Sequence, residues 1–309
     1  MTVRATSLPG VAFAGQGVRP EVVLESLRRH GAHPLVPALL DALRAPTLEA
    51  LDLTDTRVVQ PAIYVAGLAA AEARFGPAAE VPLVAGHSLG ELAALAYAGV
   101  VGAEDGLRLA LARGRLCQAV QRKRPGAMAA VVGLEPVAVE WLRRQVVAER
   151  PGVLEIAAVN GQRQVVLSGD RASVALAVAR VADTAARAVE LPIGGAFHSP
   201  LMIGALPGWR AALRAATFSP CRTRVVSCVD AEQHDDPADL RELLAKALML
   251  PVRWADTVET VRRLGVCELW DAGPGTVPRA PGRRGHAAAV SAVGGGESLP
   301  ARESDHLLS

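Results

Sequence analysis

Residues 82–98 read Pro-Leu-Val-Ala-Gly-His-Ser-Leu-Gly-Glu-Leu-Ala-Ala-Leu-Ala-Tyr-Ala, and halfway along they change from a short apolar run to a helical pattern. Residues 82–85 are typical of a buried β-strand, and residues 91–98 predict a helix that Gly99 can end. Gly86, Ser88 and Gly90 lie at the junction and form a G-x-S-x-G sequence. A strand, turn and helix in this order present a serine nucleophile in α/β enzymes. A plain glycine turn is the alternative, and we favour the nucleophile.

Short apolar runs and helical patterns alternate through the rest of the first half. Residues 11–14 predict a strand that ends in the turn Gly15-Gln16-Gly17. Residues 61–75 predict a helix with Pro61 in its first turn, and residues 104–120 predict an amphipathic helix. Short buried strands between helices favour a parallel sheet covered on both faces. We therefore expect a large α/β-hydrolase-like domain.

Residues 127–195 have a different rhythm, which indicates an inserted small domain. We expect two strands there to be joined by a tight turn at Asn160-Gly161. The expected order is βαββαβ, the plan of a ferredoxin-like unit: strand 127–134, helix 136–148, strands 155–159 and 164–168, helix 171–186 and strand 187–191. The large domain would then comprise residues 1–126 and 196–309, with a loosely ordered tail after about residue 278.

Composition excludes several classes of function. The 309 residues are 50% hydrophobic and carry a formal net charge of +2, so there is no basic excess for nucleic-acid binding. The arginines at 279, 283 and 284 fit a solvated tail better than a binding patch. Four cysteines without CxxC spacing fit reduced thiols, and no apolar run has the length of a membrane span. We expect a soluble cytoplasmic protein with no metal site.

A serine nucleophile needs a base, because its hydroxyl is protonated at neutral pH. Among seven histidines, His198 follows a predicted strand at a glycine-rich bend, Gly194-Gly195-Ala196-Phe197-His198. A structural histidine is the alternative for His198, and His87 should point away from the serine beside it. No acidic residue stands out as an orienting partner, which favours a serine–histidine dyad over a triad.

A series of motifs resembles the malonyl-CoA:acyl carrier protein transacylases, including the acyltransferase domains of polyketide synthases. Each motif is weak alone, but their order along the chain is specific. They are Phe13-Ala14-Gly15-Gln16-Gly17, Gln60-Pro61-Ala62, Gly86-His87-Ser88-Leu89-Gly90-Glu91, Arg113-Gly114-Arg115, Gly126-Ala127-Met128-Ala129, Val159-Asn160-Gly161, Ala196-Phe197-His198-Ser199-Pro200-Leu201-Met202, Pro251-Val252-Arg253-Trp254 and Gly273-Pro274-Gly275.

The resemblance implies a role for each matching residue. Ser88 would be the nucleophile and His198 the base. The backbone N–H groups of Gln16 and Leu89 would form the oxyanion hole. A backbone carbonyl near Arg253 would orient the imidazole in place of an acid. The resemblance also places Asn160 and His87 in the ligand cleft.

Arg113 is the residue expected to select the substrate. Its helical neighbours Leu109, Ala110 and Leu116 form an apolar face, where an unpaired charge is unfavourable. An arginine that extends to solvent is the alternative. The resemblance instead implies a guanidinium that binds the free carboxylate of malonate. Phe197 before the base resembles malonyl-selective members, because its bulk leaves little room for an α-methyl branch.

The expected activity is transfer of a malonyl group from malonyl-CoA to the phosphopantetheine thiol of an acyl carrier protein, in fatty-acid or polyketide synthesis. The expected enzyme is a monomer without a permanent cofactor. Alternatives are another acyl donor such as methylmalonyl-CoA, a malonate decarboxylase role, a serine hydrolase or thioesterase, and a non-catalytic docking subunit. The sequence departs from the family at Ala14, where proline is usual, at Val18-Arg19, and after Gly275, where Pro278 and Pro281 disfavour the usual helix.

Overall fold

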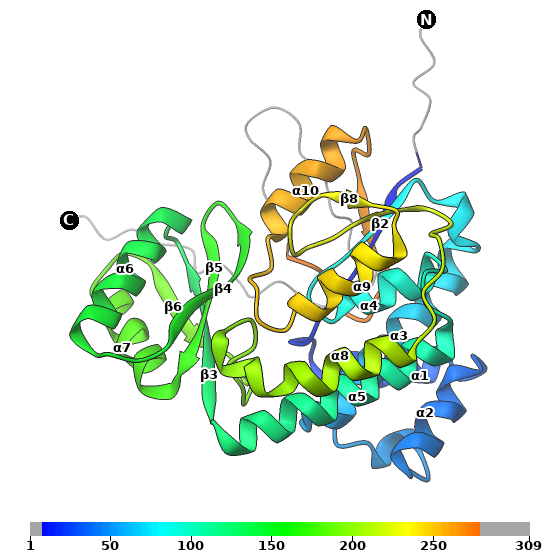
Figure 1. Ribbon diagram of the computed structural model, residues 1–309, viewed down its shortest axis with the longest axis horizontal. Coiled ribbons are helices and arrows are strands. Elements are labelled where there is room, and N and C mark those ends of the chain that lie inside the picture. Colours follow the sequence, from blue (N-terminus) through cyan, green and yellow to red (C-terminus); the bar gives the residue numbers. More distant parts are fainter. Residues whose placement is uncertain (1–7, 279–309) are drawn as a thin grey trace, which may run out of the picture.

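The computed structural model describes residues 8–278, which form a large unit and a small unit (Figure 1). The large unit is built on a five-stranded sheet with strand order β8-β7-β2-β1-β9. Its strands are β1 (Gly10–Phe13), β2 (Leu83–Gly86), β7 (Arg224–Val226), β8 (Gln233–His234) and β9 (Leu269–Asp271). All neighbouring pairs are parallel except β7 and β8, so the sheet is the parallel one expected.

Helices surround this sheet. They are α1 (Pro20–Arg29), α2 (Leu35–Leu43), α3 (Thr56–Phe75), α4 (Gly90–Tyr97), α5 (Ala103–Lys123), α8 (Leu206–Ala215), α9 (Pro237–Lys246) and α10 (Trp254–Arg263), with short 3-10 turns η1 (Leu48–Ala50), η2 (Ala78–Glu80) and η3 (Pro200–Ala205). The central helices α3 and α4 are buried over most or all of their length. Burial of apolar helices against a parallel sheet explains why these segments lack a polar face.

The small unit comprises β3 (Gly126–Val132), α6 (Pro136–Glu149), β4 (Leu154–Gly161), β5 (Gln164–Asp170), α7 (Arg171–Ala182) and β6 (Arg187–Glu190). Its sheet has the order β4-β5-β3-β6, and every pair is antiparallel. This arrangement is the ferredoxin-like βαββαβ plan expected from the sequence.

Alternation along β3 and β5 explains how the small unit attaches to the large one. Ala129, Val131 and Val165 point into a separate core under α6 and α7, whereas Met128 and Val166 join the core of the large unit. Successive strand residues face opposite sides, so one strand serves both cores. Backbone bonds reinforce the junction: the Val159 N–H donates to the Val252 carbonyl, and the Val252 N–H donates to the Ala157 carbonyl, both at 2.9 Å.

Three details of the predicted elements are wrong. Helix α3 begins at Thr56, not near Pro61, because the Asp55 carboxylate caps it by accepting the Arg57 N–H at 2.8 Å; Pro61 lies inside the helix. Strand β4 continues through Gly161, so Asn160 lies on the strand and the turn falls at residues 162–163. Helix α7 ends at Ala182, because the Thr184 hydroxyl donates to the Val181 carbonyl at 2.7 Å. The predicted tail lies outside the described residues.

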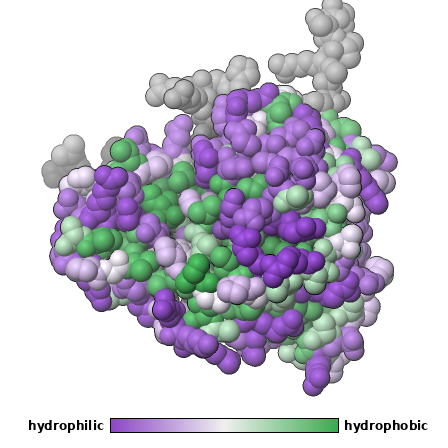
Figure 2. Space-filling model, viewed as in Figure 1, coloured by the Kyte–Doolittle hydropathy of each residue, from purple (hydrophilic) through white to green (hydrophobic). Residues whose placement is uncertain are grey.

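The surface drawn in Figure 2 is largely hydrophilic, with apolar colour gathered where the small unit meets the large unit. Within residues 8–278, no helix combines the length and the apolar character needed to cross a bilayer.

Candidate active site

Ser88 lies on a sharp turn between β2 and α4. Its φ of 54° places a non-glycine residue in the left-handed region, which costs energy. The turn is crowded, since a Cβ at Gly86 would approach the Glu91 nitrogen to 2.2 Å and one at Gly90 would approach the Phe13 carbonyl oxygen to 2.1 Å. Backbone bonds hold the strained residue, with the His87 N–H donating to Phe13 O at 2.9 Å. The two flanking glycines of the motif are therefore required by space.

His198 contacts the serine directly. Its Nε2 lies 2.7 Å from Ser88 Oγ, although 110 residues separate the two in the chain. Its Nδ1 lies 2.9 Å from the Leu250 carbonyl oxygen, and its backbone N–H donates to Leu248 O at 3.0 Å. With Nδ1 donating to Leu250, Nε2 carries the lone pair that can accept the serine proton.

The carbonyl that holds His198 was expected near Arg253; it belongs to Leu250, three residues earlier, and not to Arg253 itself. The Arg253 carbonyl oxygen accepts from the Thr257 N–H and from Thr257 Oγ1, both at 2.9 Å. Arg253 is the N-cap of α10, so its carbonyl accepts the first bonds of that helix instead of a bond from the imidazole. The Leu250 carbonyl, before the turn into the helix, remains available to His198.

The imidazole of His198 is neutral in this environment. Burial, the largest cause, and the positive charge of Arg113 together lower its pKa to about 3, although the hydrogen bond to the Leu250 carbonyl acts in the opposite direction. A neutral imidazole at physiological pH is the form that can accept a proton.

Arg113 faces the same serine from α5. Its Nη2 donates toward Ser88 Oγ at 3.4 Å, and the residue is only 5% exposed. Burial lowers the pKa of its guanidinium, yet an arginine remains charged at neutral pH. A side chain that extends to solvent is incompatible with this burial. Arg113 thus places a positive charge at the cavity, beside the Ser88 hydroxyl.

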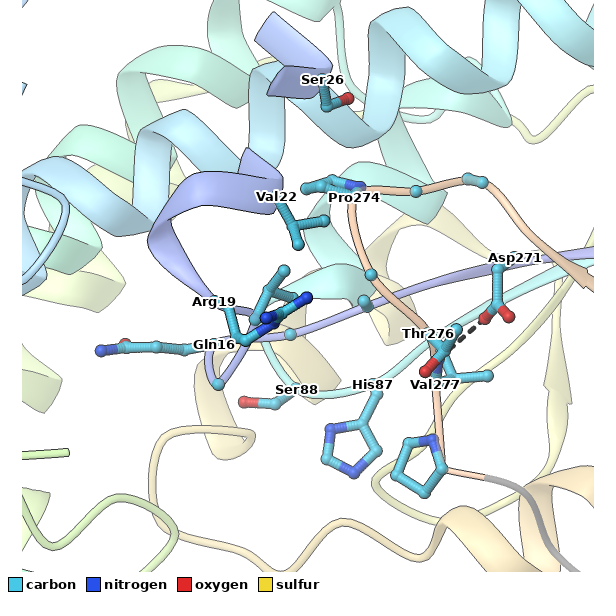
Figure 3. Close-up of a pocket in the computed structure, with 18 of the residues that line it drawn as sticks. Gln16, Arg19, Val22, Ser26, His87, Ser88, Asp271, Pro274, Thr276 and Val277 are labelled. Atoms are coloured by element: carbon cyan, nitrogen blue, oxygen red, sulfur yellow. Dashed lines mark hydrogen bonds between the residues drawn. The ribbon is translucent and has the colours of Figure 1, made fainter. Parts of the chain in front are cut away.

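Gln16 and Leu89 lie beside the serine, after β1 and at the start of α4. Among the described backbone hydrogen bonds, neither of their N–H groups donates to another residue, so both remain free for an oxyanion. The Gln16 side chain is held by Gln60 of α3, whose Nε2 donates to Gln16 Oε1 at 3.1 Å. Figure 3 shows the Gln16 and Ser88 side chains extending to the same side of the cavity.

His87 and Asn160 connect the two units across the cavity. His87 Nε2 lies 2.9 Å from Asn160 Oδ1 on β4, and the His87 ring meets Trp254 edge-on with ring centroids 5.6 Å apart. Burial lowers the pKa of His87, so its neutral ring donates this hydrogen bond. His87 is directed away from Ser88 Oγ, as expected, and bonds to the small unit.

A cavity of about 750 Å³ is lined by Gln16, His87, Ser88, Arg113, Asn160 and His198. Phe197, Met128 and Val166 form its apolar wall near the serine, together with Leu191 and Ile193. A second arm runs between α1 and the loop at residues 271–278, where Asp271 accepts the Val277 N–H at 2.7 Å (Figure 3). Within residues 8–278, no group of three or more metal-binding side chains is found.

A protein-family model for the acyl transferase domain matches residues 36–267. The chain belongs to the acyl transferase domain family. It is 34% identical over 228 residues to the malonyl CoA-acyl carrier protein transacylase of Salmonella typhimurium, covering 73% of each chain. The acyl transferase fold is shared with an acyl-carrier-protein-S-malonyltransferase from Bartonella henselae, with a TM-score of 0.73, 31% identity, and coverage of 87% and 89% of the two chains.

A further solved relative is a malonyl-transacylase in complex with its type II polyketide synthase acyl-carrier protein. It is 29% identical, has a TM-score of 0.74, and covers 88% of this acyl transferase and 90% of its own chain. The predicted family and its α/β-hydrolase-like fold with a ferredoxin-like unit are therefore confirmed.

Sequence reasoning missed three groups in this acyl transferase. Gln60 was quoted only as part of a motif, yet it fastens Gln16. The Leu250 carbonyl could not be found, because a backbone group has no sequence signature. Glu91 ends the serine motif, and nothing in the sequence indicated that it is 1% exposed and accepts a hydrogen bond on each carboxylate oxygen.

Proposed function

We propose that this chain transfers a malonyl group from coenzyme A to the phosphopantetheine thiol of an acyl carrier protein, through an ester on Ser88. One observation carries the proposal: Ser88 Oγ lies 2.7 Å from His198 Nε2 and 3.4 Å from Arg113 Nη2. A nucleophile, a base and a fixed positive charge meet at one point of a cavity. That combination suits an acyl group with its own carboxylate.

The first half-reaction forms the acyl-enzyme. Ser88 Oγ attacks the thioester carbonyl while His198 Nε2 takes its proton, and the tetrahedral intermediate carries a negative oxygen. When the intermediate collapses, the C–S bond breaks and His198 returns the proton to the leaving thiolate of coenzyme A. The Leu250 carbonyl keeps the imidazole in the tautomer that this exchange needs.

The free N–H groups of Gln16 and Leu89 are proposed to bind the negative oxygen. Loss of one such donor typically costs about 3 kcal/mol of transition-state stabilisation. Leu89 immediately precedes the first residue of α4, so the positive end of the helix dipole adds to its N–H. The bond from Gln60 to Gln16 restrains the loop that carries the second donor.

Arg113 is proposed to bind the substrate carboxylate in a two-pronged ion pair. Its buried guanidinium lines the same cavity as the apolar side chains of Phe197 and Met128, so a bound carboxylate would complete the charge balance of the cavity. Phe197 is 5% exposed, and its bulk disfavours an α-methyl branch. Malonyl is therefore preferred over methylmalonyl by this arrangement, with Asn160 and His87 lining the same cleft.

The second half-reaction reverses the first with a different thiol. The carrier's phosphopantetheine sulfur gives its proton to His198, attacks the seryl ester and takes the malonyl group, and Ser88 regains the proton. The result is a ping-pong cycle that needs no redox change or metal. The relative bound to an acyl-carrier protein supports this choice of partner.

A serine hydrolase uses the same serine and histidine, and water would then replace the carrier thiol. The buried Arg113 beside Ser88 favours transfer of a carboxylated acyl group over general ester hydrolysis. Methylmalonyl-CoA is the second candidate donor, since discrimination by one methyl group is worth only about 1–3 kcal/mol.

The decisive experiment is intact-protein mass spectrometry with malonyl-, methylmalonyl- and acetyl-CoA. We expect malonyl to accumulate on the protein most rapidly, and then to move to a holo acyl carrier protein added afterwards. The apo carrier, which lacks the phosphopantetheine thiol, is the control and should remain unmodified. Loss of the adduct to water at the same rate with and without the holo carrier would instead identify a hydrolase.

A further inference from the structure

Glu91 is a buried acidic residue directly behind the nucleophile, and the mechanism above does not use it. It lies in the first turn of α4, three positions after Ser88, and is 1% exposed. A glutamate in a first turn can stabilise a helix through the dipole, but it can do so from the surface. Burial of a carboxyl group is costly unless its oxygens are satisfied. The position therefore calls for a specific partner.

Both carboxyl oxygens of Glu91 have one. Ser227 Oγ lies 2.5 Å from Oε1 and Cys228 Sγ lies 3.1 Å from Oε2, and both partners are fully buried just after β7. Ser227 Oγ also accepts the Val229 N–H at 3.2 Å, which leaves its own proton to donate to Glu91. Two donors on one carboxylate fasten the start of α4 to the end of β7.

The same contacts lead on to the histidine. The Cys228 carbonyl oxygen accepts the Arg253 N–H at 2.7 Å. The segment before Arg253 contacts His198 twice, through the Leu250 carbonyl at 2.9 Å and the Leu248 carbonyl at 3.0 Å. On the other side, the Glu91 N–H donates to the Ser88 carbonyl at 3.0 Å. Glu91 thus stands between the turn that bears the nucleophile and the segment that orients the base.

We propose that Glu91 is a positioning residue for the reaction of Ser88. Its ionised carboxylate holds the serine turn against Ser227 and Cys228, and through Cys228 against the segment that orients His198. This keeps Ser88 Oγ and His198 Nε2 at hydrogen-bonding distance. This role of Glu91 rests on the proposed function only because acyl transfer is one of the two rates that test it.

The charges around Glu91 make the arrangement sensitive to pH. The pKa of Glu91 is raised to about 7: burial is the largest cause and nearby Asp230 adds to it, while the Ser227 and Cys228 donors and His234 act in the opposite direction. Arg113 on α5 is a further charge, since Glu91 raises the pKa of that guanidinium. Protonation of the Glu91 carboxylate removes one hydrogen-bond acceptor for Ser227 and Cys228. The reactivity of Ser88 should therefore rise as the pH increases through about 7. His198, whose pKa is lowered to about 3, does not titrate in that range.

The test compares wild type, Glu91→Gln and Glu104→Gln across pH 5.5 to 8.5. Glu104 also lies in the first turn of a helix, but its side chain is 80% exposed, so it controls for loss of charge alone. Two rates are measured by intact mass: acylation by malonyl-CoA, and sulfonylation of Ser88 by phenylmethylsulfonyl fluoride. The second reagent needs no acyl-CoA, so a failure of the proposed function does not obscure the result.

We expect Glu91→Gln to lower both rates at least tenfold at pH 8, with little change in the malonyl-CoA concentration for half-maximal rate. Its profile should lack the rise near pH 7, which Glu104→Gln keeps. Glu91→Gln reacting as fast as wild type, or keeping the rise near pH 7, would overturn the proposal.

A second pair of variants covers the case in which Glu91→Gln fails to fold. Cys228→Ser retains a donor to Glu91 Oε2, whereas Cys228→Ala removes it. Sulfonylation should stay close to the wild-type rate in the serine variant and fall several-fold in the alanine variant. Equal rates in the two variants would contradict the proposed role of this contact.

Discussion

The large unit contributes Ser88, Arg113 and His198 to the cavity. The small unit contributes Asn160 and apolar residues of the cavity wall such as Met128 and Val166. The parallel sheet explains the first set. The carboxyl ends of β1 and β2 lie at one edge, so the Gln16 and Ser88 loops meet although 72 residues separate them. The antiparallel sheet explains the second, because alternate residues of β3 face its own core and the cavity.

The surfaces of the two units differ as well. The small unit exposes several large apolar side chains, which include Val132, Val137, Trp141 and Val189. The large unit holds most of the charged and polar groups that are buried. The groups proposed for the chemistry therefore lie at the end of the parallel sheet, and the antiparallel sheet mainly encloses them. Variants of each unit should therefore differ in the size and kind of their effects.

The largest effect is expected from Ser88→Ala in the large unit. Without Oγ no ester can form, so the malonyl adduct should disappear from the intact mass. Ser26→Ala is the control, because Ser26 lines the other arm of the same cavity. An adduct of equal yield on the Ser88→Ala variant would show that another residue is the nucleophile.

The next effect is expected from His198→Ala. Removal of a general base typically costs about 10²- to 10⁴-fold in rate. Rapid-quench measurement of acyl-enzyme formation should show this loss, while His33→Ala, whose side chain bonds Glu72 near the surface, should keep the wild-type rate. A loss of less than tenfold in the His198 variant would argue against a dyad.

Arg113→Gln should change selectivity as well as rate. Loss of a charged hydrogen-bond pair is worth about 1.5–3 kcal/mol, so malonyl transfer should fall about 10- to 100-fold while acetyl transfer is spared. Removing the positive charge also raises the pKa of His198, so the lower of the two inflections in the pH profile of acetyl transfer, which reports His198, should move to higher pH.

Initial rates with malonyl- and acetyl-CoA across pH 3 to 8 measure both consequences of this change. Arg108→Gln, an exposed arginine on the same helix, is the control. An unchanged ratio of malonyl to acetyl transfer would remove Arg113 from carboxylate recognition.

The smallest effect is expected from the small unit. Asn160→Ala removes one neutral hydrogen bond to His87, worth about 0.5–1.5 kcal/mol, so kcat/KM should fall about 3- to 10-fold. Gln162→Ala, in the exposed turn after the same strand, should have no effect on kcat/KM. A loss of 10²-fold or more with Asn160→Ala would mean that the small unit takes part in the chemistry itself.

Local patterns in the chain were sufficient for β1 and β2, the serine turn and the βαββαβ order, but they did not reveal the short strands β7, β8 and β9. The serine turn requires glycine on both sides of the serine for steric reasons, so the G-x-S-x-G motif can be recognised from the sequence alone. Element ends were less predictable where a cap or a side-chain bond decides them, as Asp55 does for α3. The position of Pro61 misled the prediction, because burial of the helix outweighs its missing N–H.

The amino-acid sequence by itself determined the family, the two-unit architecture and the choice of Ser88 as the proposed nucleophile, because these depend on local periodicity and on residue types at fixed spacing. Only the tertiary structure decided which carbonyl orients His198, that Arg113 is turned inward, and that Glu91 joins α4 to the end of β7. These are contacts between segments far apart in the chain. Their distances follow from how the parallel sheet brings its strand ends together, and no local pattern records them.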